Sequence, residues 1–403
     1  MISVAEALDR IKQHAKPRAA HAIRAADALG SILAMDIKSD IDSPPHDKAL
    51  MDGYAVVASD IKSGVTLSIL EEVTAGDVPT KPVISGTATR IMTGAPIPEG
   101  ADAVVMVERT ELVDGDGTTV RINADNVESG QNIMRRGESV RTGDVVLRAG
   151  RLIRPIEMGV LAECGAAEIA AYPKPRVAIL STGNELVSAE TRPAAGQIRN
   201  SNGPMLEALV QRTGSHVVNL GVGRDERDDL ERLVRRGLEE DVLVLSGGVS
   251  AGVLDLVPEV LAANGVEQVF HKVHLKPGKP VWFGIKQDSR GDRLVFGLPG
   301  NPVSSLVCFE LFVRPALTSL AGQAFGSSER RTARLATTHS RFSDRPTYFP
   351  ARLFELDGQL QVEPLAWKGS ADLRTLADAN CLALFPPSDS EFAVGDAIEV
   401  CPL

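Results

Sequence analysis

The chain has few cysteines, and they form no recognisable cluster. Four are present among the 403 residues, at Cys164, Cys308, Cys381 and Cys401. Because none belongs to a C-x-x-C pair, the sequence supports neither a zinc site nor a disulfide framework. Buried, reduced thiols in a cytosol are the expected state of such cysteines, so we expect a cytoplasmic protein.

Long apolar runs and a surplus of positive charge are also lacking. No apolar run approaches the roughly 18 residues of a membrane span, so no membrane association is expected. The first residues, MISVAEALDRIKQH, are charged and helical in pattern, unlike a secretion signal. Lysine and arginine number 43 against 53 aspartates and glutamates, which gives a net charge of −10. This acidity argues against a nucleic-acid partner, although local cations can still line a cleft for an anion.

Familiar nucleotide-binding motifs are missing as well. The sequence contains no G-x-x-x-x-G-K-[ST] loop. Gly221 and Gly223 form a lone G-x-G, with Glu226 where the third glycine of a dinucleotide fingerprint would stand. The sequence therefore supports neither a P-loop nor a dinucleotide fingerprint.

What is present predicts several domains. A chain of 403 residues suggests two to four domains at roughly 150 residues each. The fold class that we predict is multidomain α/β plus β, with a central doubly wound, mostly parallel α/β domain. The predicted domains are a helical and linker domain (1–50 and 149–173), a β-rich domain (51–148), the α/β domain (174–326) and a C-terminal small β-barrel domain (327–403).

Periodicity and capping residues predict the helices and strands. Ser3 and Glu6 form a capping box that starts a helix ending near Lys16-Pro17, and a second helix is expected from His21 to Leu29. After Lys174-Pro175, strands and helices alternate, which is typical of a doubly wound sheet. Further helices are expected at 157–164, 204–212 (capped by Asn202), 225–239, 254–263 and 303–320, and strands at 67–70, 103–107, 145–147, 177–180, 217–220, 242–245, near 269, 281 and 295, and at 353–354, 360–362, 381–385 and 398–400.

One stretch, DVLVLSGGVSAGVLD from Asp241 to Asp255, is the first candidate for a binding site. Its apolar run, Val242 to Leu245, fits a strand buried on both faces of a parallel sheet. The turn Ser246-Gly247-Gly248 follows at the carboxyl end, where open α/β sheets bind ligands and where main-chain N–H groups can cradle an anion. Ser250 adds a hydroxyl and Asp255 a carboxylate just downstream.

Five polar turns follow predicted strands of the α/β domain, and the carboxyl ends of parallel strands share one edge. We therefore expect these turns to converge on one cleft. Carboxylates and lysines together suit a phosphate-bearing ligand and a hard cation such as Mg²⁺. The turns are Ser181–Glu185, Gly223–Asp225, Ser246–Gly248 with Asp255, Lys276–Pro280 and Leu298–Pro302.

The order of several motifs resembles the molybdopterin molybdenumtransferase family, to which the E domain of gephyrin is related. The motifs span nearly the whole chain in the family's order. They are MDGYA from Met51, MTGAP from Met92, RGE from Arg136, STGNEL from Ser181, SGGVSAG from Ser246, LKPGKP from Leu275 and GLPGNPVS from Gly297. The resemblance implies a bacterial enzyme of molybdenum cofactor synthesis with a molybdopterin-binding α/β domain.

The resemblance also implies a reaction and its residues. Adenylylated molybdopterin would bind in the α/β cleft, molybdenum from molybdate would be inserted at the dithiolene, and AMP would be released, with Mg²⁺ required. A homodimer is implied, in which Asp52 and Thr93 face the α/β cleft of the other subunit. Molybdopterin adenylyltransferase and the enzymes that accept the cofactor would be further partners. The implied catalytic residues are Asp52, Thr93, Glu185, Asp225 and Asp255, the last three also as metal ligands, and the implied substrate-binding residues are Ser246, Gly247, Gly248, Ser250, Lys276, Lys279, Pro299, Pro302, Arg352 and Ser370.

Three positions depart from the family's pattern. Ser139 replaces an acidic residue that often follows Arg-Gly-Glu, Asn184 replaces the aspartate of Gly-Asp-Glu, and Asn200 replaces the aspartate of Asp-Ser-Asn. The missing charges bear on rate and metal preference more than on the class of ligand. Tungstate in place of molybdate stays open.

Other functions stay open on the sequence alone. A molybdopterin adenylyltransferase shares the α/β fold, but the extra β domains and the MDGYA and MTGAP stretches favour the insertase. A non-catalytic pterin-binding scaffold is a second alternative, which the presence of Glu185, Asp225 and Asp255 disfavours. A generic phosphate-binding module would not need an intact Lys-Pro-Gly-Lys.

Overall fold

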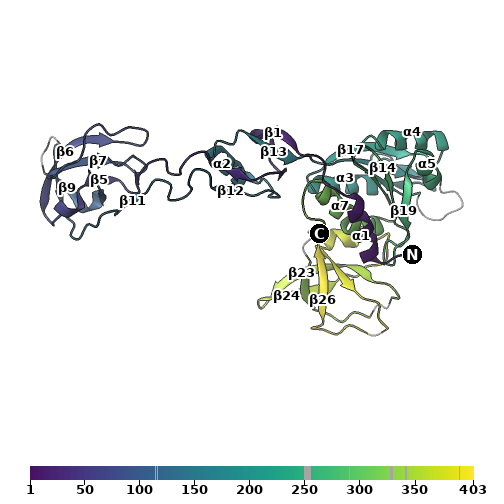
Figure 1. The fold of residues 1–403 in the computed structure, drawn as a ribbon. Helices are drawn as coiled ribbons and strands as arrows, with labels where there is room; N and C mark the ends of the chain where they lie inside the picture. Colours follow the sequence, from purple (N-terminus) through teal and green to yellow (C-terminus); the bar gives the residue numbers. More distant parts are fainter. Residues whose placement is uncertain are drawn as a thin grey trace. The chain divides into compact units, whose positions relative to one another are not determined.

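The structure of the protein is a computed structural model, and the chain forms two compact units in it (Figure 1). The first unit comprises Met1–Ile23, Gly30–Ala34 and Ala170–Leu403, and the second comprises Arg24–Leu29 and Met35–Ile169. The division into four domains stays a prediction. The structure describes residues 1–113, 115, 117–248, 256–289, 291–326, 330–340, 343–389 and 391–403.

A six-stranded sheet forms the centre of the first unit, in the strand order β17-β14-β18-β21-β20-β19. The first four strands in that order pair in parallel, whereas β20 is antiparallel to both β21 and β19. The mostly parallel α/β fold is therefore confirmed. Because two antiparallel pairings restore the direction, β19 runs the same way as β21. The bounds are β14 Arg176–Thr182, β17 His216–Gly223, β18 Val242–Ser246, β19 Glu267–His271, β20 Trp282–Lys286 and β21 Arg293–Leu298.

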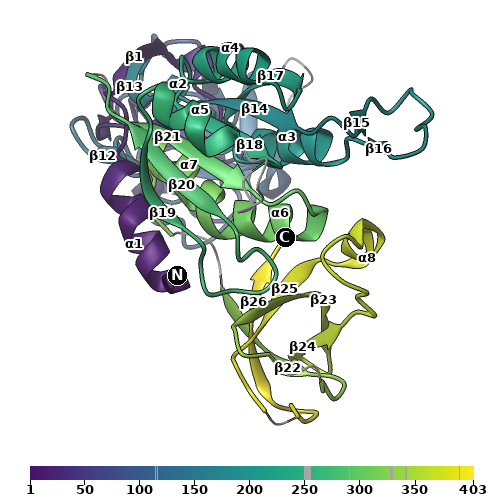
Figure 2. The ribbon, with the colours of Figure 1, turned by 90° about the vertical axis from the view of Figure 1, so that its right-hand side faces the viewer.

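Helices cover both faces of this sheet (Figure 2). Along β14, Val177 and Ile179 pack on one face with α1, α3, α6 and α7, whereas Ala178 and Leu180 pack on the other with α4 and α5. This division follows from the two-residue alternation of side chains along a strand. The bounds are α1 Val4–His14, α3 Asn202–Arg212, α4 Arg227–Gly237, α5 Val257–Ala263, α6 Pro302–Cys308 and α7 Arg314–Leu320.

The longest helical stretch, Pro302–Leu320, joins α6 and α7 through a π-helical turn at Phe309–Val313. By length and composition it could cross a membrane, so the expectation that no stretch approaches that length is wrong. Within its 18-residue window, however, 89% of the stretch is buried inside the unit. Its Glu310 carboxylate pairs with Arg314 Nε at 2.7 Å. These are the features of a core helix.

Two local predictions near the amino end have different outcomes. The predicted first helix is confirmed as α1, and the Ser3 hydroxyl caps it by accepting a hydrogen bond from Glu6 N at 3.1 Å. The predicted helix from His21 to Leu29 is wrong, because that segment forms β1 (His21–Arg24) and a short 3-10 turn. Pairing within the sheet β1-β13-β2, where β13 is Glu168–Tyr172 and β2 is Ile32–Leu33, overrides the helix propensity of its alanines.

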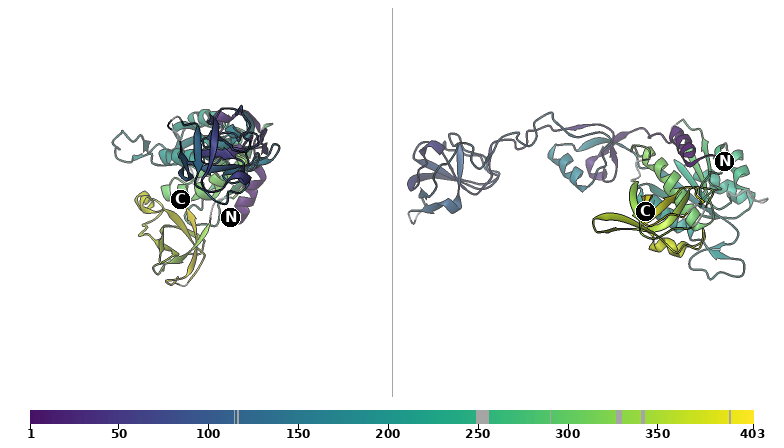
Figure 3. Two further views of the ribbon diagram at one scale, coloured as in Figure 1. Left: turned by 90° about the vertical axis from the view of Figure 1, so that its left-hand side faces the viewer. Right: turned by 90° about the horizontal axis from the view of Figure 1, so that it is seen from below.

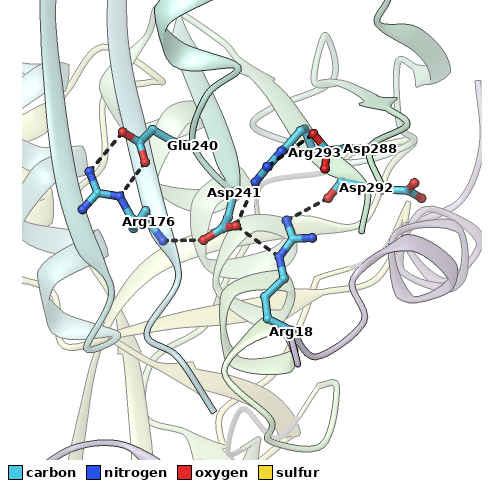
Figure 4. Close-up of polar contacts among 7 residues, drawn as sticks. All are labelled: Arg18, Arg176, Glu240, Asp241, Asp288, Asp292 and Arg293. Atoms are coloured by element: carbon cyan, nitrogen blue, oxygen red, sulfur yellow. Dashed lines mark hydrogen bonds and ion pairs between the residues drawn. The ribbon is translucent and has the colours of Figure 1, made fainter. Parts of the chain in front are cut away.

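The amino edge of the central sheet is held by ion pairs (Figure 4). Asp241, which precedes β18, accepts hydrogen bonds from Arg176 N at 2.9 Å and from Arg293 Nη1 at 3.0 Å. Arg18 Nε lies 3.1 Å from the same carboxylate. Since these residues precede or begin three of the strands, the network holds the edge that lies opposite the strand ends expected to bind ligand.

Two further β structures complete the fold. The carboxyl-terminal strands of the first unit close into a barrel in the order β22-β24-β23-β25-β26, which confirms the predicted small barrel (Figure 3). The second unit contains a sheet in the order β8-β5-β7-β6-β10-β9 and the helix α2. The bounds are β22 Arg331–Leu335, β23 Thr347–Leu356, β24 Gln359–Pro364, α8 Leu373–Asp378, β25 Cys381–Phe385 and β26 Ala397–Pro402 in the first unit, and β5 Gly53–Val56, β6 Val65–Val73, β7 Thr87–Ile91, β8 Ala103–Met106, β9 Thr110–Leu112, β10 Thr119–Ile122, β12 Val145–Leu147 and α2 Pro155–Glu163 in the second.

Candidate functional site

A cleft of about 290 Å³ lies at the carboxyl edge of the central sheet. The ends of β14 and β18, the turn after β21 and the arm formed by β15 (Leu186–Val187) and β16 (Ile198–Arg199) contribute to its wall. Ala371, just before α8 of the C-terminal barrel, and Leu373, the first residue of α8, complete it. The lining residues are Ser181, Glu185, Leu186, Ile198, Arg199, Asn200, Ser201, Asn202, Ser246, Gly300, Asn301, Pro302, Ala371 and Leu373.

Asn202 bridges two walls of the cleft. Its Nδ2 donates to Ser246 Oγ at 2.8 Å and to the carbonyl oxygen of Gly300 at 2.7 Å. The predicted capping role of Asn202 is wrong: α3 begins at Asn202 after Ser201, and Asn200 Oδ1 accepts from Gly203 N at 3.0 Å instead. The Asn202 amide can bridge the cleft because its N–H₂ group has two hydrogens to donate, one to each partner.

The turns that carry Glu185 and Asp225 lie together. They follow the parallel neighbours β14 and β17, and Asn184 joins them through reciprocal hydrogen bonds. Asn184 N donates to Asp225 Oδ2 at 3.3 Å, and Asp225 N donates to Asn184 Oδ1 at 3.1 Å. Both carboxylates are exposed, and Glu185 lines the cleft. The structure thus brings two of the three predicted metal ligands to one edge.

These carboxylates fit a magnesium ion in their chemistry. Among the described residues, no group of three His, Cys, Asp or Glu side chains could hold a metal ion, and the predicted third ligand, Asp255, lies outside those residues. Mg²⁺, however, usually keeps several waters and takes one or two carboxylates together with the phosphates of a substrate. Exposed carboxylates at Glu185 and Asp225 match that requirement.

The glycine turn after β18 has the backbone shape expected of it. Gly247 and Gly248 have φ of +93° and +61°, a region that favours glycine. A Cβ at Gly247 would also lie 2.6 Å from the carbonyl oxygen of Thr182. The predicted Ser250 lies outside the described residues. Glycine therefore lets the β14 and β18 ends approach each other at the floor of the cleft.

The two predicted lysines do not line the cleft. They lie in the turn after β19, at the same edge of the sheet but beyond β20 in the strand order. Lys276 N donates to the carbonyl oxygen of Pro346 at 2.9 Å, which ties this turn to the start of the barrel, and Lys279 is exposed. Pro302 lines the cleft at the start of α6, whereas Pro299 is buried behind it.

Of the two site residues predicted in the C-terminal domain, one lies beside the cleft and the other does not. Ser370 adjoins the cleft, because its carbonyl oxygen accepts from Val303 N at 3.0 Å and the next residue lines the wall. Arg352 is exposed on β23, opposite Glu363 of β24, and does not line the cleft. The barrel thus reaches the cleft through the segment before α8.

Asp52 and Thr93 meet in the second unit. Asp52 Oδ1 accepts hydrogen bonds from Thr93 N and from Thr93 Oγ1, both at 2.7 Å. These bonds lower the pKa of the Asp52 carboxyl, the main-chain bond most. Both residues are exposed. The MDGYA and MTGAP motifs therefore build one anionic group, and its role in a site stays a prediction.

Sequence reasoning missed several residues of the cleft. Asn202 was assigned to a helix cap and Arg199 was given no role, whereas Gly300 belongs to the Leu298–Pro302 turn that was expected at the cleft. The signal that could have found Arg199 and Asn202 is their position beside Asn200, in the segment that follows the STGNEL turn. Their contribution depends on where the base of the β15–β16 arm meets the carboxyl edge of the sheet, which no local pattern predicts.

Comparisons with known proteins agree with this architecture along the whole chain. Residues 2–165 match the MoeA N-terminal region (domain I and II), 178–319 a probable molybdopterin binding domain, and 332–403 the MoeA C-terminal region (domain IV). A cleft at the sheet edge of the molybdopterin-binding region, completed by two residues of the C-terminal region, places the chain among multidomain proteins of the MoeA type.

Curated relatives and solved structures make the family specific. The molybdopterin molybdenumtransferase of Staphylococcus aureus strain Mu50 is 33% identical over 99% of this chain and 95% of its own. That of Haemophilus influenzae is 34% identical over 93% and 92%. A molybdopterin biosynthesis MoeA protein from Pyrococcus horikoshii superposes with a TM-score of 0.82, at 31% identity over 100% and 99% of the two chains. The chain belongs to the molybdopterin molybdenumtransferase family, whose members are enzymes of molybdenum cofactor biosynthesis.

Proposed function

We propose that the protein inserts molybdenum from molybdate into adenylylated molybdopterin and releases AMP. The observation that carries the proposal is the cleft at the carboxyl edge of the sheet, within the part of the chain that matches a molybdopterin binding domain. A second cavity of about 320 Å³ adjoins it and shares Ser181 and Asn200 with it. Two adjoining spaces suit a ligand made of a pterin part and a nucleotide part.

In this proposal the residues of the chain mainly position and neutralise charge. The Ser246 turn and the Gly300 turn hold the ligand's polar groups, while the Asn202 bridge fixes the distance between them. Release of AMP is a hydrolysis, in which water adds to one phosphorus and the oxygen bridging the two phosphates leaves with the other. Fixed donors at the phosphates favour that step because they stabilise the charge that develops on the leaving oxygen.

Glu185 and Asp225 would hold Mg²⁺, with Asp255 as the third predicted ligand. Bound there, the ion would offset the negative charge of the phosphates and make AMP a better leaving group. Without a cation, the two carboxylates would repel an anionic ligand. Molybdate and adenylylated molybdopterin are the substrates in this scheme, and Lys276, Lys279, Arg352 and Ser370 remain candidates for holding anionic groups.

We further propose that the enzyme acts as a homodimer. Asp52 and Thr93 of one subunit would face the α/β cleft of the other, where the hydrogen-bonded Asp52 carboxylate stays ionised. The upstream partner would be the adenylyltransferase that supplies the adenylylated pterin, and the downstream partner an enzyme that accepts the finished cofactor.

The deciding measurement is AMP release from adenylylated molybdopterin, with molybdate and Mg²⁺ each present or omitted. Release that needs both, with active cofactor formed in step, is the expected result. Consumption of ATP with free molybdopterin would instead identify an adenylyltransferase. Tight pterin binding without AMP release would identify a scaffold and exclude the proposed reaction.

A further inference from the structure

Within the described part of the chain, the cleft wall carries little charge. Of its described lining residues, only Glu185 and Arg199 have a charged side chain. The position of the family's usual aspartate is Asn200, whose Oδ1 accepts from Ser181 Oγ at 3.2 Å and from Gly203 N at 3.0 Å. Among the described residues, Arg199 is therefore the cation of the cleft wall, and the two predicted lysines are not part of that wall.

Arg199 is held in place but its charge is not neutralised. It pairs with Val187 in the β15–β16 arm, which stands out from the α/β domain (Figures 2 and 3). Its Nε donates to the carbonyl oxygen of Thr191 at 3.2 Å. Within the part of the chain that the structure describes, no carboxylate pairs with Arg199, and its two terminal nitrogens have no partner. The fixed Nε leaves the fork of the guanidinium available at the mouth of the cleft.

A second polar group in the same cleft also lacks a partner. Asn202 is only 8% exposed, and among the described residues nothing donates a hydrogen bond to its buried Oδ1. Its Nδ2 already donates to Ser246 and Gly300, so the amide cannot flip to give Oδ1 a partner without losing both of those hydrogen bonds. Buried acceptors are nearly always paired, and an unpaired one inside a cleft points to a ligand or a bound water that completes it.

We propose that Arg199 binds the phosphate of the nucleotide part of the substrate and thereby selects for it. This inference rests on the proposed function, because it assumes an adenylylated ligand in this cleft. A guanidinium presents two parallel N–H donors that match two phosphate oxygens, and such charge-assisted pairs are among the strongest hydrogen bonds in proteins. Arg199 is a binding residue in this account and takes no part in bond cleavage.

The test measures binding of AMP and of adenosine by calorimetry to the full-length protein and to Arg199→Gln. For AMP, the dissociation constant should rise about tenfold or more in Arg199→Gln, whereas binding of adenosine should not change. Arg192→Gln is the matched control, since Arg192 is an exposed arginine of the same arm that does not line the cleft. Arg199→Lys should recover part of the lost affinity, because it restores the charge but not the fork.

Two results would overturn the proposal. Equal AMP affinity in the wild type and Arg199→Gln would show that Arg199 does not contact the phosphate. An equal loss for AMP and adenosine would show a general disturbance of the cleft, as would a loss in the Arg192→Gln control. AMP release by the wild-type enzyme distinguishes a failure of this inference from a failure of the proposed function. If the wild type releases AMP normally but Arg199→Gln binds AMP as tightly as the wild type, the role of Arg199 is excluded and the proposed function still holds.

Discussion

At the scale of single residues, the Asp225 carboxylate is positioned by a main-chain amide. Asp225 is held by Asn184 N, so an amide in its place would keep the size but lose the charge. We expect Asp225→Asn to lower Mg²⁺-dependent AMP release by at least about tenfold and to leave the thermal unfolding midpoint unchanged. The release assay over a range of Mg²⁺ concentrations tests this expectation.

Asp228→Asn is the control for that change. Asp228 is an exposed aspartate in the first turn of α4, three residues further along. It should retain wild-type turnover. Unchanged Mg²⁺ dependence in Asp225→Asn would remove Asp225 from the mechanism.

The Asp52–Thr93 pair makes a pH-dependent prediction. Thr93 N and Oγ1 lower the pKa of the Asp52 carboxyl, so Thr93→Val, which removes the hydroxyl donor, should raise that pKa. If AMP release requires ionised Asp52, then on acidification the activity of Thr93→Val should begin to fall at a higher pH than that of the wild type. The pH profile of AMP release checks the direction of the shift.

Thr74→Val provides a matched control, because Thr74 N and Oγ1 donate to Asp77 in the same arrangement elsewhere in the second unit. Its pH profile should match the wild type. A profile of Thr93→Val that also coincides with the wild type would contradict a role for ionised Asp52.

At the scale of elements, the glycine of MDGYA has a packing role. Gly53 begins β5, and a Cβ there would lie 1.9 Å from the carbonyl oxygen of Val105 in the neighbouring strand β8. Since backbone atoms cannot move aside cheaply, Gly53→Ala should lower the free energy of unfolding of the second unit by about 3 kcal/mol. Denaturant unfolding measures the loss.

Gly159→Ala tests the same substitution where space allows it. Gly159 lies inside α2, and a Cβ there would meet nothing within 4 Å. Alanine should stabilise this helix by about 0.5–1 kcal/mol. Equal effects of the two alanines would contradict the close β5–β8 approach as the reason for Gly53.

Asp42 joins two turns of the second unit, and its ionisation makes the stability of that unit depend on pH in acid. Its carboxylate accepts from Thr142 N at 2.8 Å and from Arg136 Nε at 2.7 Å. The main-chain bond from Thr142, and then the Arg136 contact, lower the pKa of Asp42 from 3.8 to about 2. A lowered pKa means that the stabilisation is complete above the unfolded-state pKa near 4 and is lost as pH falls through about 2.

Asp42→Asn should therefore lower stability at neutral pH and flatten the dependence of stability on pH between about 4 and 2. Unfolding followed at a series of pH values measures this slope. Glu108→Gln, at an exposed position whose carboxylate makes no hydrogen bond or ion pair within the described residues, should leave the slope as it is. An unchanged slope in Asp42→Asn would show that the carboxylate is not held in this way.

At the scale of the whole molecule, the proposed sharing of the site between two subunits predicts how mixed dimers behave. Asp52→Asn and Asp225→Asn should each release AMP at a small fraction of the wild-type rate when assayed alone. If Asp52 of one subunit serves the cleft of the other, a mixed dimer has one intact site and one doubly altered site. Random mixing in equal amounts makes half of the dimers mixed, so about a quarter of wild-type AMP release should return.

No recovery after mixing, with subunit exchange verified by differently tagged chains, would contradict a shared site. The Asp225→Asn variant mixed with Arg352→Gln would then show whether the barrel serves the cleft of its own subunit or of the other.

The outcome of prediction differed between elements for physical reasons. The α1 helix and the strands of the central sheet were predictable, because a capping box and continuous apolar runs depend on nearby residues alone. The segment from His21 to Leu29 was mispredicted as a helix, because its pairing with β13 involves residues far along the chain. The charge pattern located the Glu185 and Asp225 turns correctly at one edge, since both follow parallel strands.

The sequence by itself determined the family motifs, the mostly parallel sheet and the edge at which polar turns gather. Tertiary structure alone decided which of those turns share a cleft. It placed Lys276 and Lys279 beyond β20 and brought Arg199 and Asn202 to the ends of β18 and β21 instead. The physical reason is that strand direction follows from local periodicity, whereas strand order and the fold of the β15–β16 arm depend on contacts between residues distant in the chain.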